Sequence, residues 1–173
     1  MDGELRELPP ESGLNDALAN YLFLILVNAG LPFTWVRPGK CEIEVPVLQA
    51  KDARTRMPNL VVLKPEHLPL IEKRLTIRVE AAPPHLVAEV VSPGDANRRR
   101  DYQRKRAQYQ ARGIPEYWLI DPAQQTVTVL ELQAGRYQQI GSFQAEQPLQ
   151  SSLLTHLSLT LIPKQIFAMG SAL

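Results

Sequence analysis

A glutamate stands in the middle of one of the most apolar segments of this chain. Glu89 is flanked by Val87, Val90 and Val91 in the sequence HLVAEVVS. Burying an ionised carboxylate without a partner is very costly, so Glu89 requires either a structural ion pair or a place in a binding or catalytic site. Lys105, in the basic segment that follows, is the candidate partner.

The spacing of polar residues predicts an amide next to this carboxylate. In an extended strand, alternate side chains share a face, which groups Glu89 with Val87 and Val91. In the segment 58–63, PNLVVL, Asn59 is in phase with the first valine and the last leucine. If the two strands pair, Asn59 and Glu89 lie side by side and face the same helix.

The basic segment after this strand adds a lysine and a tyrosine. Asp101, Lys105 and Tyr109 recur every four residues, so on a helix they form one stripe. Arg99 and Arg106 are expected to project to solvent from the same helix. An acid, an amide oxygen and a lysine together suit a divalent metal ion and a phosphate. Hard cations prefer oxygen ligands, and an ammonium group stabilises developing negative charge.

Structural roles compete with each of these functional interpretations. Glu89 and Lys105 can form a buried ion pair without catalytic meaning, and such a pair is weak evidence even for stability. Asn59 is of a residue type that commonly satisfies local backbone groups at the start of a strand. The arginines can line a solvated helix face, because no aromatic residue is interleaved at their exposed positions. Three scattered histidines and one cysteine argue against a zinc site.

The pattern along the chain predicts an α/β protein whose elements position these residues. Ser12 is a candidate N-cap for a helix that ends at Gly30. The segment 85–92 is apolar on both faces apart from its glutamate, which is typical of a central strand, and Gly113 suits the end of the following helix. The other predicted elements are strands within 33–48 on both sides of a Pro-Gly turn, strands at 58–63, 116–120 and 157–161, a hairpin around Gly135, and a helix from Pro163.

Length, charge and cysteine content limit the possible functions. The 173 residues suffice for one domain, 1–173, and the net charge of +1 does not make the whole molecule a polycation. Residues 98–112 nevertheless hold seven Lys or Arg and one Asp, a net of +6, which leaves −5 elsewhere. Cys41 has no possible disulfide partner, and the most apolar run, 21–27, is too short to span a bilayer. We therefore expect a cytoplasmic protein with no membrane partner.

Five segments of the chain resemble the Uma-two family of restriction-endonuclease-like proteins, which belongs to the PD-(D/E)XK nuclease superfamily. They are E-S-x-x-N from Glu11 to Asn15, R-x-P-N-L-V-V-L, L-V-A-E-V-V-S-P, D-x-x-x-K-x-x-x-Y and G-I-P-E-Y-W-L-I-D-P. The resemblance spans nearly the whole chain and is most specific from Leu86 to Pro122. It implies an αβββαβ core, with a central mixed sheet flanked by helices and extra C-terminal strands. It also implies metal-dependent cleavage of phosphodiester bonds.

The resemblance implies roles for individual residues as well. Glu89 matches the acidic metal ligand of the third motif, and Lys105 matches the lysine that this family supplies from the following helix. Glu11 matches an acidic position that borders the site. Asn59 stands where the family usually has the aspartate of its P-D pair, and the lost charge is expected to weaken binding of Mg²⁺ or Mn²⁺. The residues with supporting roles are Asp101 and Tyr109.

Three functions remain open at this point. The first is a magnesium-dependent endonuclease acting on DNA, in which Glu89 and Asn59 hold the metal. The second is a catalytically inactive module of the same fold that binds nucleic acid or a protein partner, and the third is a structural domain that acts through its oligomer. A homodimer is expected by analogy with the fold family. The residues expected to contact DNA phosphates are Arg98, Arg99, Arg100, Arg104, Arg106, Lys51, Arg54 and Arg56.

Overall fold

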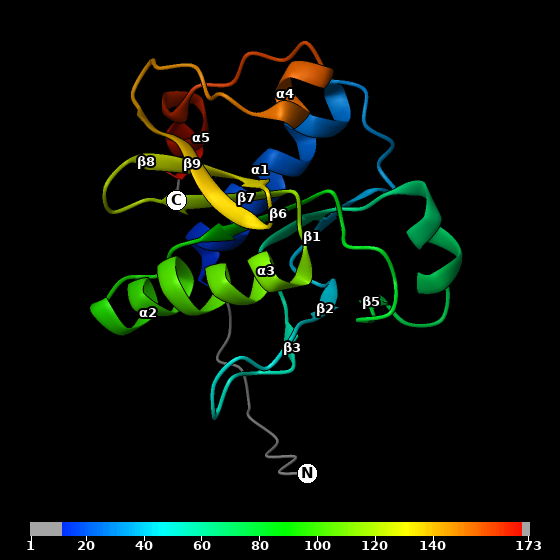
Figure 1. Cartoon of the computed structure of the whole chain (residues 1–173). Coiled ribbons are helices and arrows are strands. Elements are labelled where there is room, and N and C mark those ends of the chain that lie inside the picture. The colour runs from blue at the N-terminus through cyan, green and yellow to red at the C-terminus, as the bar shows by residue number, and fades with distance from the viewer. Residues whose placement is uncertain (1–11, 171–173) are drawn as a thin grey trace.

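A six-stranded mixed sheet forms the centre of the structure, a computed structural model that describes residues 12–170 (Figure 1). Its strands, in spatial order, are β1 (Val36–Pro38), β4 (Leu60–Val62), β6 (Leu86–Val90), β7 (Glu116–Asp121), β8 (Thr126–Gln133) and β9 (Arg136–Gln144). Strands β6 and β7 are parallel, and every other neighbouring pair is antiparallel. The glutamate-containing strand β6 is therefore central, as predicted.

A smaller three-stranded sheet lies next to the amino-terminal half of the large one (Figure 1). It is formed by β3 (Thr55–Arg56), β2 (Glu42–Glu44) and β5 (Thr76–Ile77), and a 3-10 helix, η1 (Pro65–Ile71), precedes β5. The two sides of the predicted Pro38-Gly39 turn thus belong to different sheets, β1 to the large sheet and β2 to the small one. Strands of two or three residues carry too little alternation to be recognised in a sequence.

Three helices cover one face of the large sheet (Figure 1). They are α1 (Gly13–Asn28), α4 (Ser152–His156) and α5 (Pro163–Gly170). The predicted cap of α1 is confirmed, because the hydroxyl of Ser12 accepts a 3.1 Å hydrogen bond from the backbone N–H of Asn15. Apolar side chains of these helices pack on Leu86, Ala88 and Val90 of β6, which form one face of that strand.

The opposite face carries one continuous helical segment in three parts. These are α2 (Asp95–Arg99), the π-helix η2 (Arg100–Lys105) and α3 (Arg106–Arg112). The segment ends at Gly113, whose φ of 79° lies in the left-handed region that glycine adopts without strain. Val87 and Val91 pack on this side together with Tyr109. The predicted alternation of β6 is thereby confirmed, and it directs Glu89 toward this helix.

The predicted strand at 157–161 is wrong. This segment follows the short helix α4, pairs with no strand and contains Ser158 at a φ of 52°, outside the extended region. The alternation in its sequence is nevertheless real, because Leu157 and Leu159 are half-buried against the core and Leu161 is buried. Periodic burial therefore misled the prediction, since an irregular segment packed on a core can bury every second residue too.

The mixed sheet between two layers of helices confirms the predicted fold class. The helix that starts at Pro163 and the hairpin of β8 and β9 around Gly135 are also present. None of the helices within residues 12–170 combines the length and the apolar character needed to cross a membrane.

Candidate active site

Glu89 lies in the middle of β6 and only 1% of it is exposed. Its Oε2 atom is 2.8 Å from Nζ of Lys105, and its Oε1 atom accepts a 2.6 Å hydrogen bond from the hydroxyl of Tyr109. Both partners come from the helical segment that covers this face of the sheet. The carboxylate that appeared isolated in the sequence is therefore paired on both of its oxygens.

Lys105 connects two carboxylates. Its ammonium nitrogen is 2.8 Å from Glu89 and 2.9 Å from Oδ1 of Asp101. Asp101 is fully buried and also accepts a 3.1 Å hydrogen bond from Nε of Arg100. The side chain of Lys105 is 13% exposed, more than that of either carboxylate. The ammonium group therefore lies between the buried acids and the protein surface.

The π-helix η2 contains the first part of this cluster. A π-helix closes its hydrogen bonds over five residues instead of four, so the stripe of Asp101, Lys105 and Tyr109 is not the regular α-helical one that the sequence predicted. Tyr117, on β7, donates a 3.0 Å hydrogen bond to the backbone carbonyl of Asp101. Wide turns of this kind are frequent at functional sites. The sequence indicated only a packing role for Tyr117, because its hydroxyl contact depends on the tertiary fold.

Asn59 is placed next to Glu89, as predicted. The register of β4 and β6 pairs Leu60 with Ala88, so Asn59 is opposite Glu89 one residue further along. The side chain of Asn59 is buried, and its Oδ1 atom accepts a 2.8 Å hydrogen bond from the backbone N–H of Val90. The structural role considered for this amide is thus present, and its role as a metal ligand stays a prediction.

Burial dominates the electrostatics of the cluster. Loss of hydration raises the pKa of the Glu89 carboxyl above its usual range, while the positive charge of Lys105 opposes this shift and the negative charge of Asp101 adds to it. Burial, and next the negative charge of Glu89, hold the pKa of Tyr109 well above its ordinary value. Tyr109 therefore keeps its proton at neutral pH and acts as the donor in its bond to Glu89.

The oxygen donors of this site fit one Mg²⁺ ion with few protein ligands. Each carboxylate oxygen of Glu89 faces one donor and Oδ1 of Asn59 accepts one hydrogen bond, so each oxygen keeps a further lone pair. Mg²⁺ usually rests on one or two carboxylates together with waters and substrate phosphates. Within residues 12–170, no group of three or more His, Cys, Asp or Glu side chains is placed to hold a metal. Glu11, the remaining predicted acid, lies outside the described residues.

Comparison with known families assigns the chain. The model of the Uma2 family, described as "Putative restriction endonuclease", matches residues 1–162. The chain belongs to the Uma2 family. The resemblance of its sequence motifs is thereby confirmed, and the family assignment supports a nuclease function. A search of curated proteins found no match.

A solved structure supports the fold of this Uma2 chain. It is a crystal structure from Anabaena variabilis ATCC 29413, described as "a putative nuclease belonging to DUF820". The two chains share 17% sequence identity and a TM-score of 0.67, over 98% of this chain and 89% of the other. At this identity the similarity shows the fold alone.

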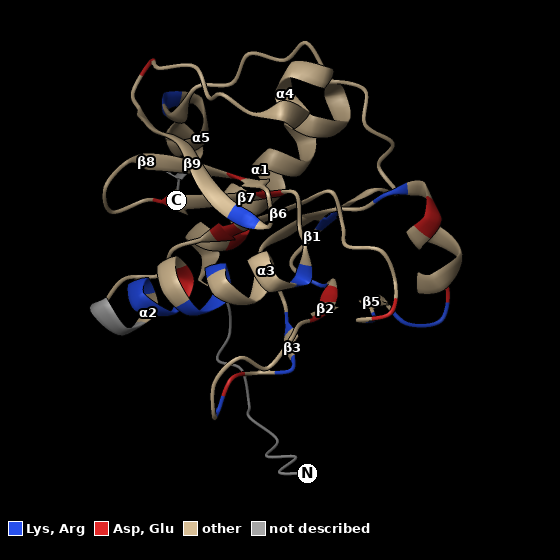
Figure 2. Ribbon diagram, viewed as in Figure 1, with Lys and Arg blue, Asp and Glu red and all other residues tan. Residues whose placement is uncertain are grey.

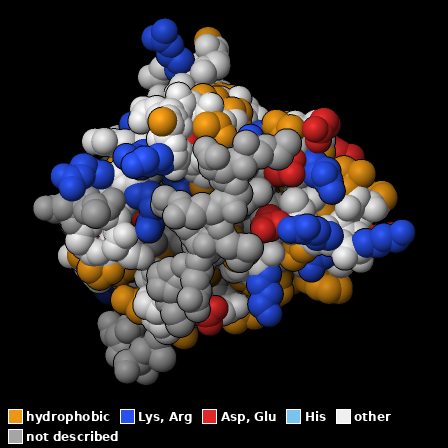
Figure 3. Space-filling view, turned by 90° about the horizontal axis from the view of Figure 1, so that it is seen from below, with side chains coloured by type: hydrophobic (Ala, Val, Ile, Leu, Met, Phe, Trp, Pro, Cys, Tyr) orange, Lys and Arg blue, Asp and Glu red, His pale blue; other side chains and the backbone are white. Residues whose placement is uncertain are grey.

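The basic residues of this Uma2 chain that were expected to contact DNA fall into two groups (Figures 2 and 3). Arg99, Arg104, Lys51 and Arg54 are exposed, and their contact with phosphates stays a prediction. The other four are half-buried and have partners within the protein. These are Arg98 with the Asp121 carboxylate, Arg100 with Asp101, Arg56 with Gln108, and Arg106 with the backbone carbonyl of Tyr137.

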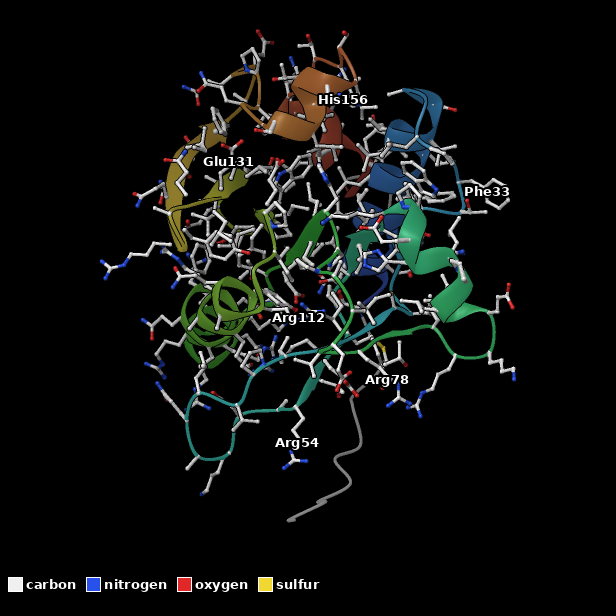
Figure 4. All side chains as sticks on the ribbon, turned by 45° about the vertical axis from the view of Figure 1, so that its right-hand side comes forward. Phe33, Arg54, Arg78, Arg112, Glu131 and His156 are labelled. Atoms are coloured by element: carbon white, nitrogen blue, oxygen red, sulfur yellow. The ribbon has the colours of Figure 1, made fainter. Side chains whose placement is uncertain are left out.

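Arg106 corrects one expectation and Arg112 reveals a residue that the sequence did not single out. Arg106 does not simply project to solvent, because it reaches across to the carbonyl of β9. Arg112 is buried between α3 and the small sheet, as Figure 4 shows, and donates to the carbonyls of Glu44, Arg78 and Ala81 at 2.8–3.2 Å. Positive charge in the segment 98–112 therefore serves internal contacts as well as the surface.

Proposed function

We propose that this protein is a metal-dependent endonuclease that hydrolyses phosphodiester bonds of DNA. The observation that supports this most directly is the 2.8 Å pair of Glu89 and Lys105, with Asn59 opposite the glutamate. An acid able to hold a cation, next to an ammonium able to stabilise a charged phosphate, is the arrangement that phosphodiester hydrolysis requires. The assignment to the Uma2 family supports the same class of reaction.

Each residue has its own task in the proposed site. Glu89 and Asn59 would hold Mg²⁺ or Mn²⁺, which when bound supplies Lewis-acid polarisation of a phosphoryl oxygen. Lys105 has three N–H donors, two of which face Glu89 and Asp101, so the third can bind a phosphate oxygen. Tyr109 orients the Glu89 carboxylate through its hydrogen bond. The exposed arginines of the helix would contact phosphates without regard to base sequence.

The proposal is tested by a cleavage assay on three proteins. Wild type, Glu89→Gln and Asn59→Asp are incubated with supercoiled, linear duplex and single-stranded DNA, in Mg²⁺, in Mn²⁺ and in EDTA. Wild type should nick or cleave DNA only with a divalent metal, and Glu89→Gln should lose this activity. Asn59→Asp should cleave at least as well as wild type at lower metal concentration, because a second carboxylate strengthens cation binding.

A matched surface variant controls this assay. Lys164→Ala removes an exposed cation on α5, bonded to Glu146 and on the other side of the sheet from Glu89, and should leave cleavage unchanged. Circular dichroism of every variant excludes loss of fold as the cause of lost activity. If none of the three proteins cleaves any form of DNA with either metal, the enzymatic proposal is wrong.

A second candidate function is a catalytically inactive DNA-binding module. Asn59 favours it, because this side chain carries no charge and its oxygen already serves the backbone N–H of Val90. In that case wild type yields no product with either metal, and salt-sensitive binding to DNA survives in Glu89→Gln. Cleavage by Asn59→Asp alone would show that the chain has lost an ancestral activity through this one residue.

A further inference from the structure

The loop between β2 and β3 forms an arm that projects from the body of the protein (Figure 1). We define the arm as residues 46–54. It is fastened at its base by the buried amide of Gln108 on α3, which donates to the carbonyls of Pro46 and Ala53 at 2.7 and 2.9 Å. The oxygen of the same amide accepts hydrogen bonds from the guanidinium of Arg56. All hydrogen-bonding groups of the Gln108 side chain are therefore used to hold the arm.

The tip of the arm is folded by its own contacts. The carboxylate of Asp52 accepts hydrogen bonds from the backbone N–H groups of Leu48 and Gln49, at 3.3 and 3.0 Å, and the N–H of Asp52 donates to the carbonyl of Gln49. These bonds fix the turn before any ligand binds. They also engage the one acid of the arm, so that its charge is directed at the backbone.

The arm presents two apolar and two basic side chains to solvent. Val47 and Leu48 are 51% and 47% exposed, and Lys51 and Arg54 are exposed beside them. Figure 4 shows Arg54 directed away from the body of the protein. Single exposed apolar residues are ordinary, but two neighbours on a preformed turn next to two cations form a compact amphipathic tip. Such a tip matches the surface of duplex DNA, where anionic phosphates border apolar sugar and base edges.

We propose that the arm is a contact element for duplex DNA. Lys51 and Arg54 bind phosphates, while Val47 and Leu48 pack on sugars and base edges in the adjoining groove. The sequence of the arm, PVLQAKDAR, contains no aromatic side chain on which an unpaired base could stack, which favours a duplex over a single strand. The inference rests on the proposed function only in taking DNA as the ligand. It does not require cleavage.

The helix α3 links the arm to the candidate active site. Gln108 holds the arm, and the next residue, Tyr109, donates its hydroxyl hydrogen to Glu89. Neighbouring residues of one helix therefore fix the arm and the carboxylate relative to each other. A duplex gripped by the arm is in this way held at a set position with respect to Glu89.

The test is a binding titration in EDTA, where no metal-dependent cleavage occurs. Fluorescently labelled duplex and single-stranded DNA of the same sequence are titrated at several salt concentrations with wild type, Lys51→Ser/Arg54→Ser and Val47→Ser/Leu48→Ser. The basic variant should bind duplex more weakly and lower the slope of log K against log salt by about 1.8, that is about 0.9 for each phosphate contact. The apolar variant should lose roughly fivefold or more in affinity without a change in slope. Leu70→Ser/Lys73→Ser, which changes exposed residues outside the arm, is the matched control and should bind as wild type.

The outcomes separate this inference from the proposed enzymatic function. If wild type binds duplex and both arm variants bind equally well, the arm proposal is overturned while the nuclease proposal is untouched. If binding depends on the arm but no protein cleaves, the arm proposal stands and the nuclease proposal fails. Equal or tighter binding of the single strand overturns the preference for duplex. If wild type binds no duplex but binds poly-glutamate through the arm, the ligand is an acidic polypeptide and the DNA proposal is overturned.

Discussion

Removal of the Lys105 ammonium tests how strongly the buried acids depend on it. In Lys105→Met, Glu89 keeps only the hydrogen bond from Tyr109. Breaking a buried ion pair on one side typically costs 3–5 kcal/mol, because it leaves an uncompensated buried charge. The Lys105 side chain is 13% exposed, so some solvation reaches the pair, and we expect a loss of about 2–4 kcal/mol in the free energy of unfolding at pH 8.

This loss should shrink as the pH falls. Burial already raises the pKa of Glu89 in the folded protein, and the variant lacks the opposing charge of Lys105, so the pKa rises further. An acid whose pKa is higher in the folded than in the unfolded state gives stability that is present below the unfolded pKa and is lost as the pH rises through the folded pKa. The variant should therefore be much closer to wild type at pH 5 than at pH 8.

Urea unfolding at both pH values measures these differences. The double variant Glu89→Gln/Lys105→Met removes both charges of the pair and should recover most of the lost stability, since buried pairs are often replaceable by neutral groups at little cost. Arg104→Met, an exposed neighbour on the same helix, should change stability by less than about 0.5 kcal/mol. A loss below 1 kcal/mol for Lys105→Met at pH 8, or a double variant no more stable than the single one, would refute the reasoning.

Two further predictions concern groups near the small sheet. Burial raises the pKa of the Cys41 thiol to about 12, so a thiol reagent at pH 8 should modify Cys41 only as fast as the protein unfolds, and rapid modification of the native protein would contradict its burial. Gln108→Ala removes the bonds at the base of the arm, so hydrogen exchange should accelerate in residues 47–54 while β6 stays protected, and unchanged exchange in the arm would show that Gln108 does not hold it.

The relation between Glu89, Asn59 and Lys105 could be predicted because it follows from simple periodicities. Alternation in β6 and β4 groups the acid and the amide on neighbouring strands, and a spacing of about four residues brings the lysine over them. Length and apolar character identified β6 as a central strand. These signals are local, and each needs only one assumption about which strands pair.

Other parts of the cluster could not be predicted because they depend on contacts across the fold. Nothing in the segment 100–105 distinguishes a π-helix from an α-helix, and the contact of Tyr117 with the Asp101 carbonyl joins residues 16 positions apart. The partners of Arg98 and Arg106 likewise come from β7 and β9, so the sequence overstated the charge available at the surface. The small sheet, with strands of two and three residues, has no periodic signal.

The pairing of Lys105 with two acids does not by itself argue against a role in catalysis. A lysine between Glu89 and Asp101 keeps its charge and has one N–H donor beyond the two that face these carboxylates. The acids fix the ammonium at the outer edge of the buried cluster, so a phosphate that meets it would not have to organise the side chain first. The contacts that stabilise the folded chain are thus the same ones that would prepare this lysine for a charged substrate, and stability measurements on Lys105 variants alone cannot separate the two roles. Cleavage and binding measured on the same variants can.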